Sequence, residues 1–573
     1  SFSLTVQNTN RPPEEPQLVS PENDSLSIKP DLVELIWECS DADGDTLVYD
    51  IYFGTEETQD LVFSNHESCL YELGELSLGT KYYWKIVAKD NKGGVTEGPL
   101  WNFTTGIHYT FVFTVVIEGQ GSVMKSIDKT EYIDGEEIEL TAVPEAGWDF
   151  SNWSGDLTGT SNPEKIILNR DMFVTATFEE ISFSGGSGTI DDPYKVATAA
   201  QLNSVRNYLS EHFAQVNNID LNIFKDWEPI GDNFANFSGS FDGQEFQISN
   251  LYVIDESNYS GLFGYISESA VLKKINLVNI EIFSDSMYSG SLVGFSKGEI
   301  SECSSNGGSV HGGDYTGGLV GDTFEGTIAN CHVSIDVRGE NYSGGFTGRN
   351  LGTISGSNYN GNVTGYDYTG GFVGSNEGVI RTCSANVIVS GSGYTGGFVG
   401  ISYGAIEFSL SCGEVRSYGH RTGGLVGYNE GTIRESCSKC DVYGGGNRIG
   451  GLVGNNNQGR ITDCYATGDV RGGSSVGGLV GQNWYGYVYR SYSLGKVEGS
   501  TDTGGLIGFN NTIYRVENTY WNRETSGWWD WSAGGEPKTT EEMKQQLTFE
   551  PEWDFESVWA ITEGEDYPYL QWE

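Results

Sequence analysis

Three aspartates in one short stretch are the residues of this chain best suited to chemistry. The stretch DADGD places Asp41, Asp43 and Asp45 at alternate positions. Carboxylate oxygens are the ligands that Ca²⁺ prefers, and a tight loop brings them together. An EF-hand would carry a glutamate at the twelfth position, which is Tyr52, so the stretch is not an EF-hand. We predict calcium as a cofactor at these aspartates; the alternative is an Asp-Gly turn capped by its own side chains. Further oxygen donors from a linker or a neighbouring loop are Asn8, Asn10 and Asp90.

Tyrosines recur in front of a repeated glycine-rich phrase, and they are the second set of candidate residues. The phrase YTGGFVG stands at residues 368–374 and again at 394–400. The tyrosine column comprises Tyr259, Tyr288, Tyr315, Tyr342, Tyr368 and Tyr394, after which Arg421, Arg448, Ser475 and Asp502 take the position. Rings one strand spacing apart stabilise one another by stacking. An exposed column would also offer a platform to sugar rings or to a partner protein. The candidate ligand-binding residues are therefore Tyr288, Tyr315, Tyr342, Tyr368 and Tyr394.

The patterns that define common hydrolases are not met by this sequence. None of its six histidines begins the HExxH pattern of a zinc peptidase. The Gly-Gly-Ser-Gly at 185–188 belongs to a linker and not to the strand-to-helix turn of a serine hydrolase. A glycosidase would need carboxylates aligned on neighbouring coils, but the column of Asp336 is interrupted by Ile388. We predict that the chain is not an enzyme and keep polysaccharide degradation as an alternative.

These residues must be positioned by a repeated structure, because the glycine phrase returns at intervals of 26 to 30 residues. Its last glycines are Gly264, Gly294, Gly321, Gly348, Gly374, Gly400, Gly427, Gly454, Gly481 and Gly508. Units so rich in Gly, Ser, Thr and Val disfavour helix. Each unit contains three short apolar stretches, which predict three strands per unit. Stacked units of this kind predict an all-β fold with a parallel β-solenoid, or β-helix, of about ten coils.

Three apolar columns predict the core of this solenoid, and one polar column predicts bonds between coils. The first column is Ile300, Ile328, Ile354, Ile380, Ile406, Ile433, Ile461 and Val488. The second is Val337, Val363, Val389, Val415, Val442, Val470 and Val497. The third is Leu319, Phe346, Phe372, Phe398, Leu425, Leu452, Leu479 and Leu506. The asparagine column is Asn350, Asn376, Asn429, Asn456, Asn483 and Asn510, whose amides are suited to hydrogen-bond the next coil.

Phrases such as TGGLVG (422–427) and TGGLIG (503–508) resemble the GLUG repeats of bacterial and archaeal surface proteins. The resemblance covers roughly 260–510. It implies a protein of the kind in which such repeats occur, namely large adhesins or proteins that also carry a metallopeptidase domain. We predict the solenoid over 260–515. Residues 182–259 are predicted as an N-terminal cap and first coil, with a helix over about 198–212 that begins at a Thr198–Gln201 capping box. Residues 516–573 are predicted as a Trp-rich C-terminal cap sealed by Trp521, Trp553, Trp559 and Trp572.

Two smaller modules precede the repeat. LIWECSDADGDTLVYDIYFGT, LGTKYYWKIVAKDNKGG and WNFTT are similar to bacterial fibronectin type III-like modules, which implies a β-sandwich over 14–105. FVFTVVIEGQGSV and DGEEIELTAVPEAGWDFSNWSGD resemble a divergent internalin-type B-repeat, which implies a small β-rich spacer over 106–181. Residues 1–13 are predicted as the last strand and linker of a preceding domain; alternatively, this strand pairs with another subunit.

Two disulfides are candidates if the chain folds in an oxidising compartment. They would join Cys39 to Cys69, or Cys412 to Cys440.

The charge and composition of the chain exclude some classes of partner. A net charge of −47 repels nucleic acid and anionic lipid, and no apolar run approaches the ~20 residues of a membrane span. We predict no nucleic-acid partner and no membrane insertion of this chain. With the resemblances, the sequence predicts a secreted cell-surface protein with a structural or adhesive role, in attachment, filaments or a surface layer. Expected partners are cell-surface glycans, other surface proteins, or copies of the chain joined through the N-terminal strand. The alternative is a glycan-binding module that uses the tyrosine column.

Overall fold

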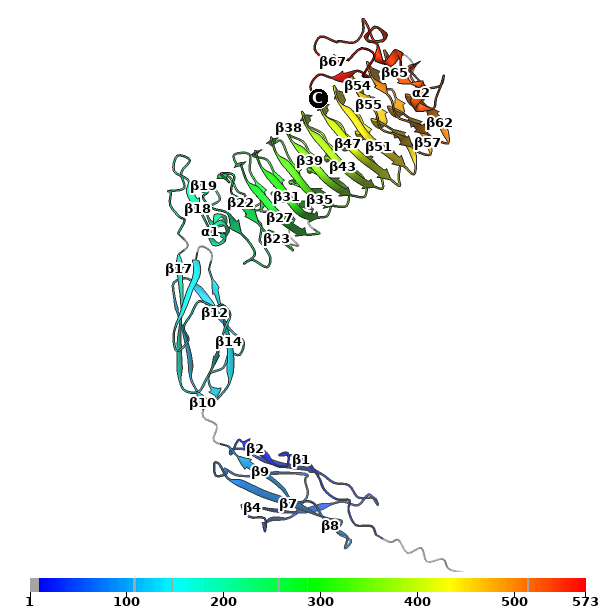
Figure 1. The fold of residues 1–573 in the computed structure, drawn as a ribbon. Helices are drawn as coiled ribbons and strands as arrows, with labels where there is room; N and C mark the ends of the chain where they lie inside the picture. The colour runs from blue at the N-terminus through cyan, green and yellow to red at the C-terminus, as the bar shows by residue number, and fades with distance from the viewer. Residues whose placement is uncertain are drawn as a thin grey trace, which may run out of the picture. The chain divides into compact units, whose positions relative to one another are not determined.

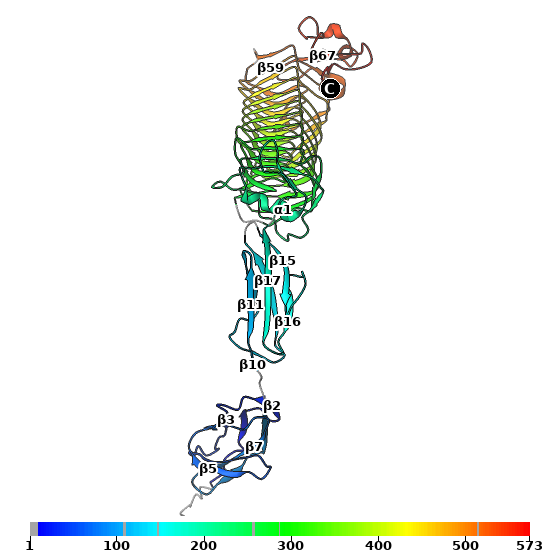
Figure 2. The same cartoon turned by 90° about the vertical axis from the view of Figure 1, so that its left-hand side faces the viewer.

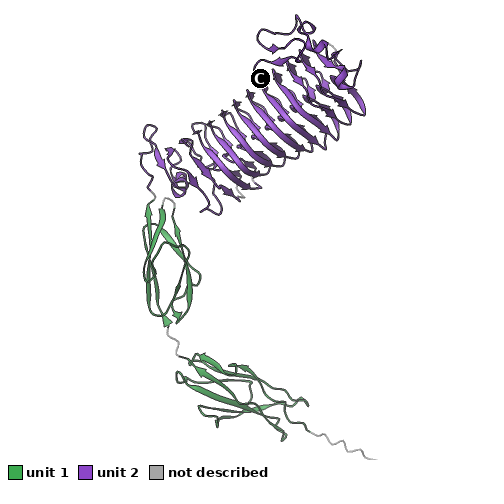
Figure 3. Cartoon of the chain, viewed as in Figure 1, with its two compact units in different colours: residues 1–180 green, residues 181–573 purple. Residues whose placement is uncertain are grey.

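The computed structural model describes residues 10–106, 110–145, 148–180, 182–254, 258–285, 287–512 and 515–573. The chain divides into two compact units, residues 1–180 and residues 181–573 (Figure 3). Nearly all regular structure is β-strand, which confirms the all-β prediction (Figure 1). The helices in the described parts are all too short or too polar to cross a bilayer. Residues 1–9, which carry the predicted N-terminal strand and Asn8, lie outside the described residues.

Residues 17–105 form two β-sheets around an aromatic core. One sheet has the order β1 (Gln17–Ser20), β3 (Glu34–Glu38), β6 (Leu70–Glu72). The other has the order β2 (Ser25–Ile28), β9 (Trp101–Thr105), β7 (Lys81–Lys89), β4 (Val48–Gly54), β5 (Asp60–His66), with β8 (Val95–Glu97) paired to β7. Strict alternation along β7 turns Trp84 and Ile86 inward against Trp37 of β3. The likeness of this module to fibronectin type III stays a prediction.

Residues 110–180 form a second β-module with its own core. Its first sheet is β11 (Phe113–Glu118), β17 (Met172–Glu180), β15 (Trp148–Gly155), with β11 parallel to β17. Its second sheet is β12 (Gly121–Lys125), β14 (Glu137–Pro144), β16 (Glu164–Ile167), and β10 (Thr110–Phe111) pairs with β13 (Tyr132–Ile133). Trp153 and Tyr132 are buried in the core, and Trp148 and Phe150 pack against it.

The second unit is a parallel β-solenoid whose coils stack strand upon strand (Figure 2). A representative coil contains β36 (Tyr342–Gly344), β37 (Thr347–Asn350), β38 (Thr353–Ser355) and β39 (Asn358–Thr364). Each strand pairs in parallel with its equivalent in the next coil, which builds two sheets of ten strands, one of 13 and one of 16. The prediction of about ten coils in a parallel solenoid is confirmed.

The prediction of three strands per coil is wrong, because the glycine phrase bends in its middle. In YTGGFVG the chain leaves β40 (Tyr368–Gly370), turns at Gly371 and Phe372, and enters β41 (Val373–Asn376). A Cβ on Gly371 would lie 2.1 Å from the carbonyl oxygen of Gly397 in the next coil. The double glycine therefore permits a close approach at a corner between two strands, and the following Phe372 fills the interior.

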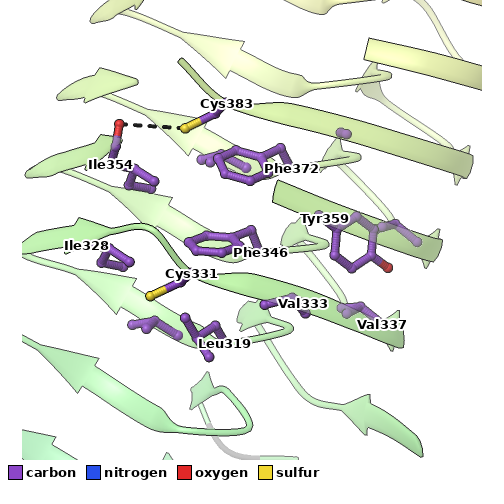
Figure 4. Packing of buried hydrophobic residues seen from close by; sticks show 14 of the residues in the cluster. Leu319, Ile328, Cys331, Val333, Val337, Phe346, Ile354, Tyr359, Phe372 and Cys383 are labelled. Atoms are coloured by element: carbon purple, nitrogen blue, oxygen red, sulfur yellow. Dashed lines mark hydrogen bonds between the residues drawn. The ribbon is translucent and has the colours of Figure 1, made fainter. Parts of the chain in front are cut away.

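The predicted apolar columns are the core, as the close-up of three coils shows (Figure 4). Ile328, Ile354 and Ile380 lie directly opposite one another in register, and the valine column does likewise on another sheet. The third column lies at the corners, where the rings of Phe346 and Phe372 stack with their centroids 4.6 Å apart. All nine cysteines are free thiols, so neither predicted disulfide is present in the structure.

The N-terminal cap contains a shorter helix than predicted. Helix α1 (Ala199–Ser204) begins at the expected capping box, where the backbone N–H of Gln201 donates to Thr198 Oγ1 at 3.3 Å. It continues only as a 3₁₀ turn over Val205–Asn207, a turn follows over residues 208–211, and β19 (His212–Gln215) begins at the last residue of the predicted helix. The reason is tertiary: β19 pairs with β18 (Tyr194–Val196) and β21 (Ser240–Asp242), which extends a solenoid sheet over the cap.

The C-terminal residues close the end of the solenoid. After β65 (Tyr520–Asn522) the chain crosses the last coil, and the N–H of Gly505 donates to the carbonyl oxygen of Trp531. The N–H of Ala533 donates to the carbonyl oxygen of Ile507, and β66 (Glu536–Lys538) then pairs with β65. These bonds satisfy edge groups that would otherwise invite another chain.

The predicted tryptophan seal is divided between two places. Trp521 lies in the solenoid core. Trp553 and Trp559 instead cover the outer face of the last coils, where they pack with Tyr465 and Tyr492. The chain folds back along this face, and Trp572 Nε1 donates to the carbonyl oxygen of Glu435 at 2.8 Å. The seal therefore protects a side of the solenoid as well as its end.

Candidate functional site

The DADGD stretch forms the turn between β3 and β4. Asp41 Oδ1 accepts hydrogen bonds from the backbone N–H of Asp43 at 2.8 Å and of Asp45 at 3.3 Å. Gly44 has φ of 77°, a left-handed conformation that glycine adopts without strain. The side-chain-capped turn that the sequence offered as the alternative is thus present, and it uses one oxygen of Asp41.

Asp43 binds Arg11 and is not among the carboxylates that gather with Asp41 and Asp45. Its carboxylate accepts from the Arg11 backbone N–H at 2.7 Å, from Nε at 2.9 Å and from Nη2 at 2.8 Å. These hydrogen bonds hold the pKa of the Asp43 carboxyl below its ordinary value. Asp43 therefore anchors the segment that precedes β1, and it is not placed to share a ligand with Asp41 and Asp45.

Asp90 takes the place that the spacing assigned to Asp43. One carboxylate oxygen from each of Asp41, Asp45 and Asp90 lies within 4.8 Å of the others. Asp90 stands just after β7, is only 2 % exposed, and accepts from the backbone N–H groups of Lys92 at 2.7 Å and Gly94 at 2.8 Å. Of the further donors named from the sequence, Asp90 and Asn10 are at the cluster; Asn10 Nδ2 lies 2.5 Å from Asp90 Oδ2.

The tyrosine column forms a continuous stack along a ten-stranded sheet. Tyr342 lies 4.8 Å from Tyr315 and 4.7 Å from Tyr368, centroid to centroid, with interplanar angles of 6° and 8°. The remaining neighbouring pairs, from Tyr259 to Tyr394, are also stacked, at 5.1 to 5.4 Å. All six side chains are half-buried. Burial raises the pKa of the phenols of Tyr288, Tyr315, Tyr342 and Tyr368 above its ordinary value, so they stay neutral.

The stacking decides which part of each ring another molecule can reach. Both faces of Tyr342 and Tyr368 are covered by neighbouring tyrosines, so the ring edges and hydroxyls are the parts left to contact a ligand. The Arg421 guanidinium covers the last ring, 4.5 Å from the centroid of Tyr394. Arg421 and Arg448 adopt left-handed φ of 66° and 69°, so the backbone itself changes where the tyrosine column ends.

Sequence reasoning missed a groove beside the first coils. It measures about 740 Å³ and is lined by Phe283, His311, Arg338, Glu340 and Tyr366, among others. Phe283, His311 and Arg338 lie opposite one another at the ends of β27 (Asn276–Phe283), β31 (Ser304–His311) and β35 (His332–Arg338). Tyr366 is 67 % exposed and Phe283 is 41 % exposed. These positions differ from coil to coil, so no column revealed them.

Comparisons with known proteins agree with two of the resemblances. The family model described as a divergent InlB B-repeat domain matches residues 111–182, and the GLUG motif matches residues 445–471. The fold and these matches define a β-solenoid protein with one segment that matches the GLUG motif and another that matches a divergent InlB B-repeat domain.

Two curated proteins share part of this sequence. A "Putative Gly-rich membrane protein" of Evansella cellulosilytica is 36 % identical over 181 residues, which are 29 % of this chain and 21 % of that protein. "Halomucin" of Haloquadratum walsbyi is 32 % identical over 183 residues, which are 28 % of this chain and 2 % of that protein. The match thus covers about a fifth of the first relative and a small fraction of the second.

Proposed function

We propose that this chain is part of a secreted surface protein in which the solenoid is a stiff structural and adhesive element. The proposal rests on one observation: the side chains that recur along the solenoid contact one another between coils. The isoleucine, valine and phenylalanine columns fill the core. The tyrosine column stacks on itself, and buried asparagines bond from coil to coil, as from Asn456 to Asn483. Side chains that recur from coil to coil thus hold the coils together.

The relatives support a surface location. One is named a membrane protein rich in glycine, and the other is named halomucin. The B-repeat spacer module and the net charge of −47, which keeps copies soluble and apart, suit a chain displayed outside the cell.

Labelling of intact producing cells tests this proposal. Antibodies raised against residues 182–573 should label the cells before lysis, and external protease should remove the label. Cells that lack the gene should attach less well to surfaces or to one another, and the restored gene should recover attachment. Labelling that requires lysis, or attachment that is unchanged without the gene, would contradict the proposal.

A second candidate function, glycan binding, is favoured by the groove more than by the tyrosine column. Sugar rings stack on open aromatic faces and bond to charged side chains beside them. The groove combines exposed Tyr366 and Phe283 with Arg338 and Glu340, whereas the faces of Tyr342 are covered. On a glycan array, Tyr366→Ala should abolish any binding that the wild type shows, and Tyr342→Phe should keep it. No bound glycan, or loss with Tyr342→Phe alone, would reject the groove as the site.

The prediction that the chain is not an enzyme stays a prediction. A reducing-end assay on acidic and neutral polysaccharides tests it. Turnover that disappears with a single carboxylate substitution such as Glu340→Gln would overturn it.

A further inference from the structure

We infer that Asp41, Asp45 and Asp90, together with Asn10, bind one calcium ion at the edge of the first β-module. The inference is independent of the proposed surface role. It also differs from the site that the DADGD spacing predicts, because Asp43 is replaced by Asp90, which lies 47 positions further along the chain.

The first argument is that two enclosed carboxylate oxygens have nothing to bind. Oδ2 of Asp41 and Oδ2 of Asp45 are shielded from solvent, and among the described residues neither accepts a hydrogen bond. A buried charged oxygen without a partner is costly, because the water that solvated it has been lost. Both oxygens belong to residues whose ligand atoms gather within 4.8 Å, so one cation would satisfy both.

The second argument is the charge balance at the cluster. The three carboxylates carry three negative charges, and like charges this close repel strongly. The ammonium of Lys92 lies 2.5 Å from Asp45 Oδ1, but the Lys92 side chain is 58 % exposed. Asp90 is 2 % exposed, and its other partners are neutral N–H groups of the backbone and of Asn10. One ammonium leaves two negative charges uncompensated, which a divalent cation would neutralise.

The third argument is that the backbone makes room for this arrangement. A Cβ on Gly94 would lie 2.0 Å from Asp90 Oδ2 and 2.8 Å from the Cα of Pro12. Glycine at this position lets the buried carboxylate and the segment before β1 approach each other. Asn10 thereby reaches the cluster, and a half-turn of its amide would present Oδ1 in place of Nδ2.

The donor set selects calcium. Carboxylate and amide oxygens are hard ligands, and Ca²⁺ accepts about 6–8 of them in flexible geometry, with water in the remaining positions. Mg²⁺ demands a near-ideal octahedron and usually keeps most of its water. Three carboxylates from two separate turns, joined by an amide from a third segment, therefore suit Ca²⁺. The bound ion would fasten residues 10–13 to the module, beside the contact of Arg11 with Asp43.

The test compares the full chain with Asp45→Asn and with Asp43→Asn as the matched control, since both substitutions remove one charge from the same turn. Calcium binding is counted by equilibrium dialysis. Amide hydrogen exchange is measured in CaCl₂ and in EGTA. The wild type and Asp43→Asn should each bind one more ion than Asp45→Asn. Calcium should slow exchange in peptides that contain residues 41–45 and 90–94 in the wild type, and Asp45→Asn should lose this effect.

A melt in EGTA shows whether the variant is folded. Asp45→Asn should unfold at no lower temperature than the wild type there, because it relieves repulsion. Calcium should then raise the midpoint of the first module by about 4 °C or more in the wild type and in Asp43→Asn, but not in Asp45→Asn. Equal ion counts for the wild type and Asp45→Asn would overturn the inference, as would a wild-type midpoint that calcium leaves unchanged. An equal response to Mg²⁺ would overturn the assignment to calcium.

Discussion

The buried asparagine column allows a direct test of how coils are held together. Asn456 is fully buried, accepts from Asn429 Nδ2 at 2.8 Å and donates to Asn483 Oδ1 at 2.9 Å. It also donates to the carbonyl oxygen of Gly459 at 3.2 Å. We predict that Asn456→Ala weakens the solenoid locally, because it removes all three bonds from a site that water cannot enter.

The magnitude follows from which partners are left unsatisfied. The carbonyl of Gly459 still accepts from the N–H of Tyr487, and the Asn429 amide still reaches the carbonyl oxygen of Gly431. Asn483 Oδ1 loses its donor. An orphaned buried acceptor costs about 1–3 kcal/mol and a lost bond about 1 kcal/mol more, so we expect a loss of about 2–4 kcal/mol.

Amide hydrogen exchange measures this loss where it occurs. In peptides that cover β53 (Val453–Asn457) and β58 (Val480–Trp484), exchange should become roughly 30- to 900-fold faster. The matched control is Asn386→Ala, since Asn386 Nδ2 makes the same kind of bond between coils, to Asn360 Oδ1 at 3.0 Å, on the exposed surface. That substitution should cost no more than about 0.5 kcal/mol. Equal effects of the two substitutions would refute the reasoning that burial gives the column its value.

Substitutions at three further sites, each with a matched comparison, test the packing of the solenoid in urea unfolding. Phe372→Ala should cost about 3–5 kcal/mol, and Phe372→Leu clearly less, because Leu425 fills the same column in another coil; equal costs would contradict the packing argument. Arg349→Ala should cost about 3 kcal/mol, because it strands the fully buried Asp322 carboxylate, and Asp322→Ser added to it should recover stability; further loss in the double variant would speak against the ion pair. Tyr342→Ala should cost about 1–3 kcal/mol for two stacked ring pairs, and Tyr342→Phe much less; an unchanged midpoint with Tyr342→Ala would mean that the stack adds nothing.

The first module shows why spacing alone did not identify which aspartates gather in one cluster. The alternate spacing of Asp41, Asp43 and Asp45 predicted that the three would share one ion. Side chains in a tight turn, however, do not all point the same way. Asp43 faces Arg11, which lies 32 positions away in the sequence. The antiparallel register of β4 and β7, with Val48 opposite Lys89, is what brings Asp45 beside Asp90. Spacing along the chain contains no information about this register.

The two caps of the solenoid were also only partly predictable from the sequence. The Thr198–Gln201 capping box was predictable because it joins residues three apart, and it is present. The end of the same helix was not, since strand pairing by β19 outweighs the helical periodicity that follows. Nor did the content of tryptophan reveal that Trp553 and Trp559 cover the outer face of the last coils.

The solenoid, its approximate number of coils and the residues of its core columns could all be predicted from the repeat in the sequence. Contacts in a solenoid join equivalent residues of successive repeats, so the period of the sequence is also the list of contacts. The corner within each glycine phrase, the covered faces of the tyrosine column, the groove and the membership of the acidic cluster became visible only in the folded structure. Those features depend on backbone direction and on contacts between segments that do not repeat, and a one-dimensional pattern encodes neither.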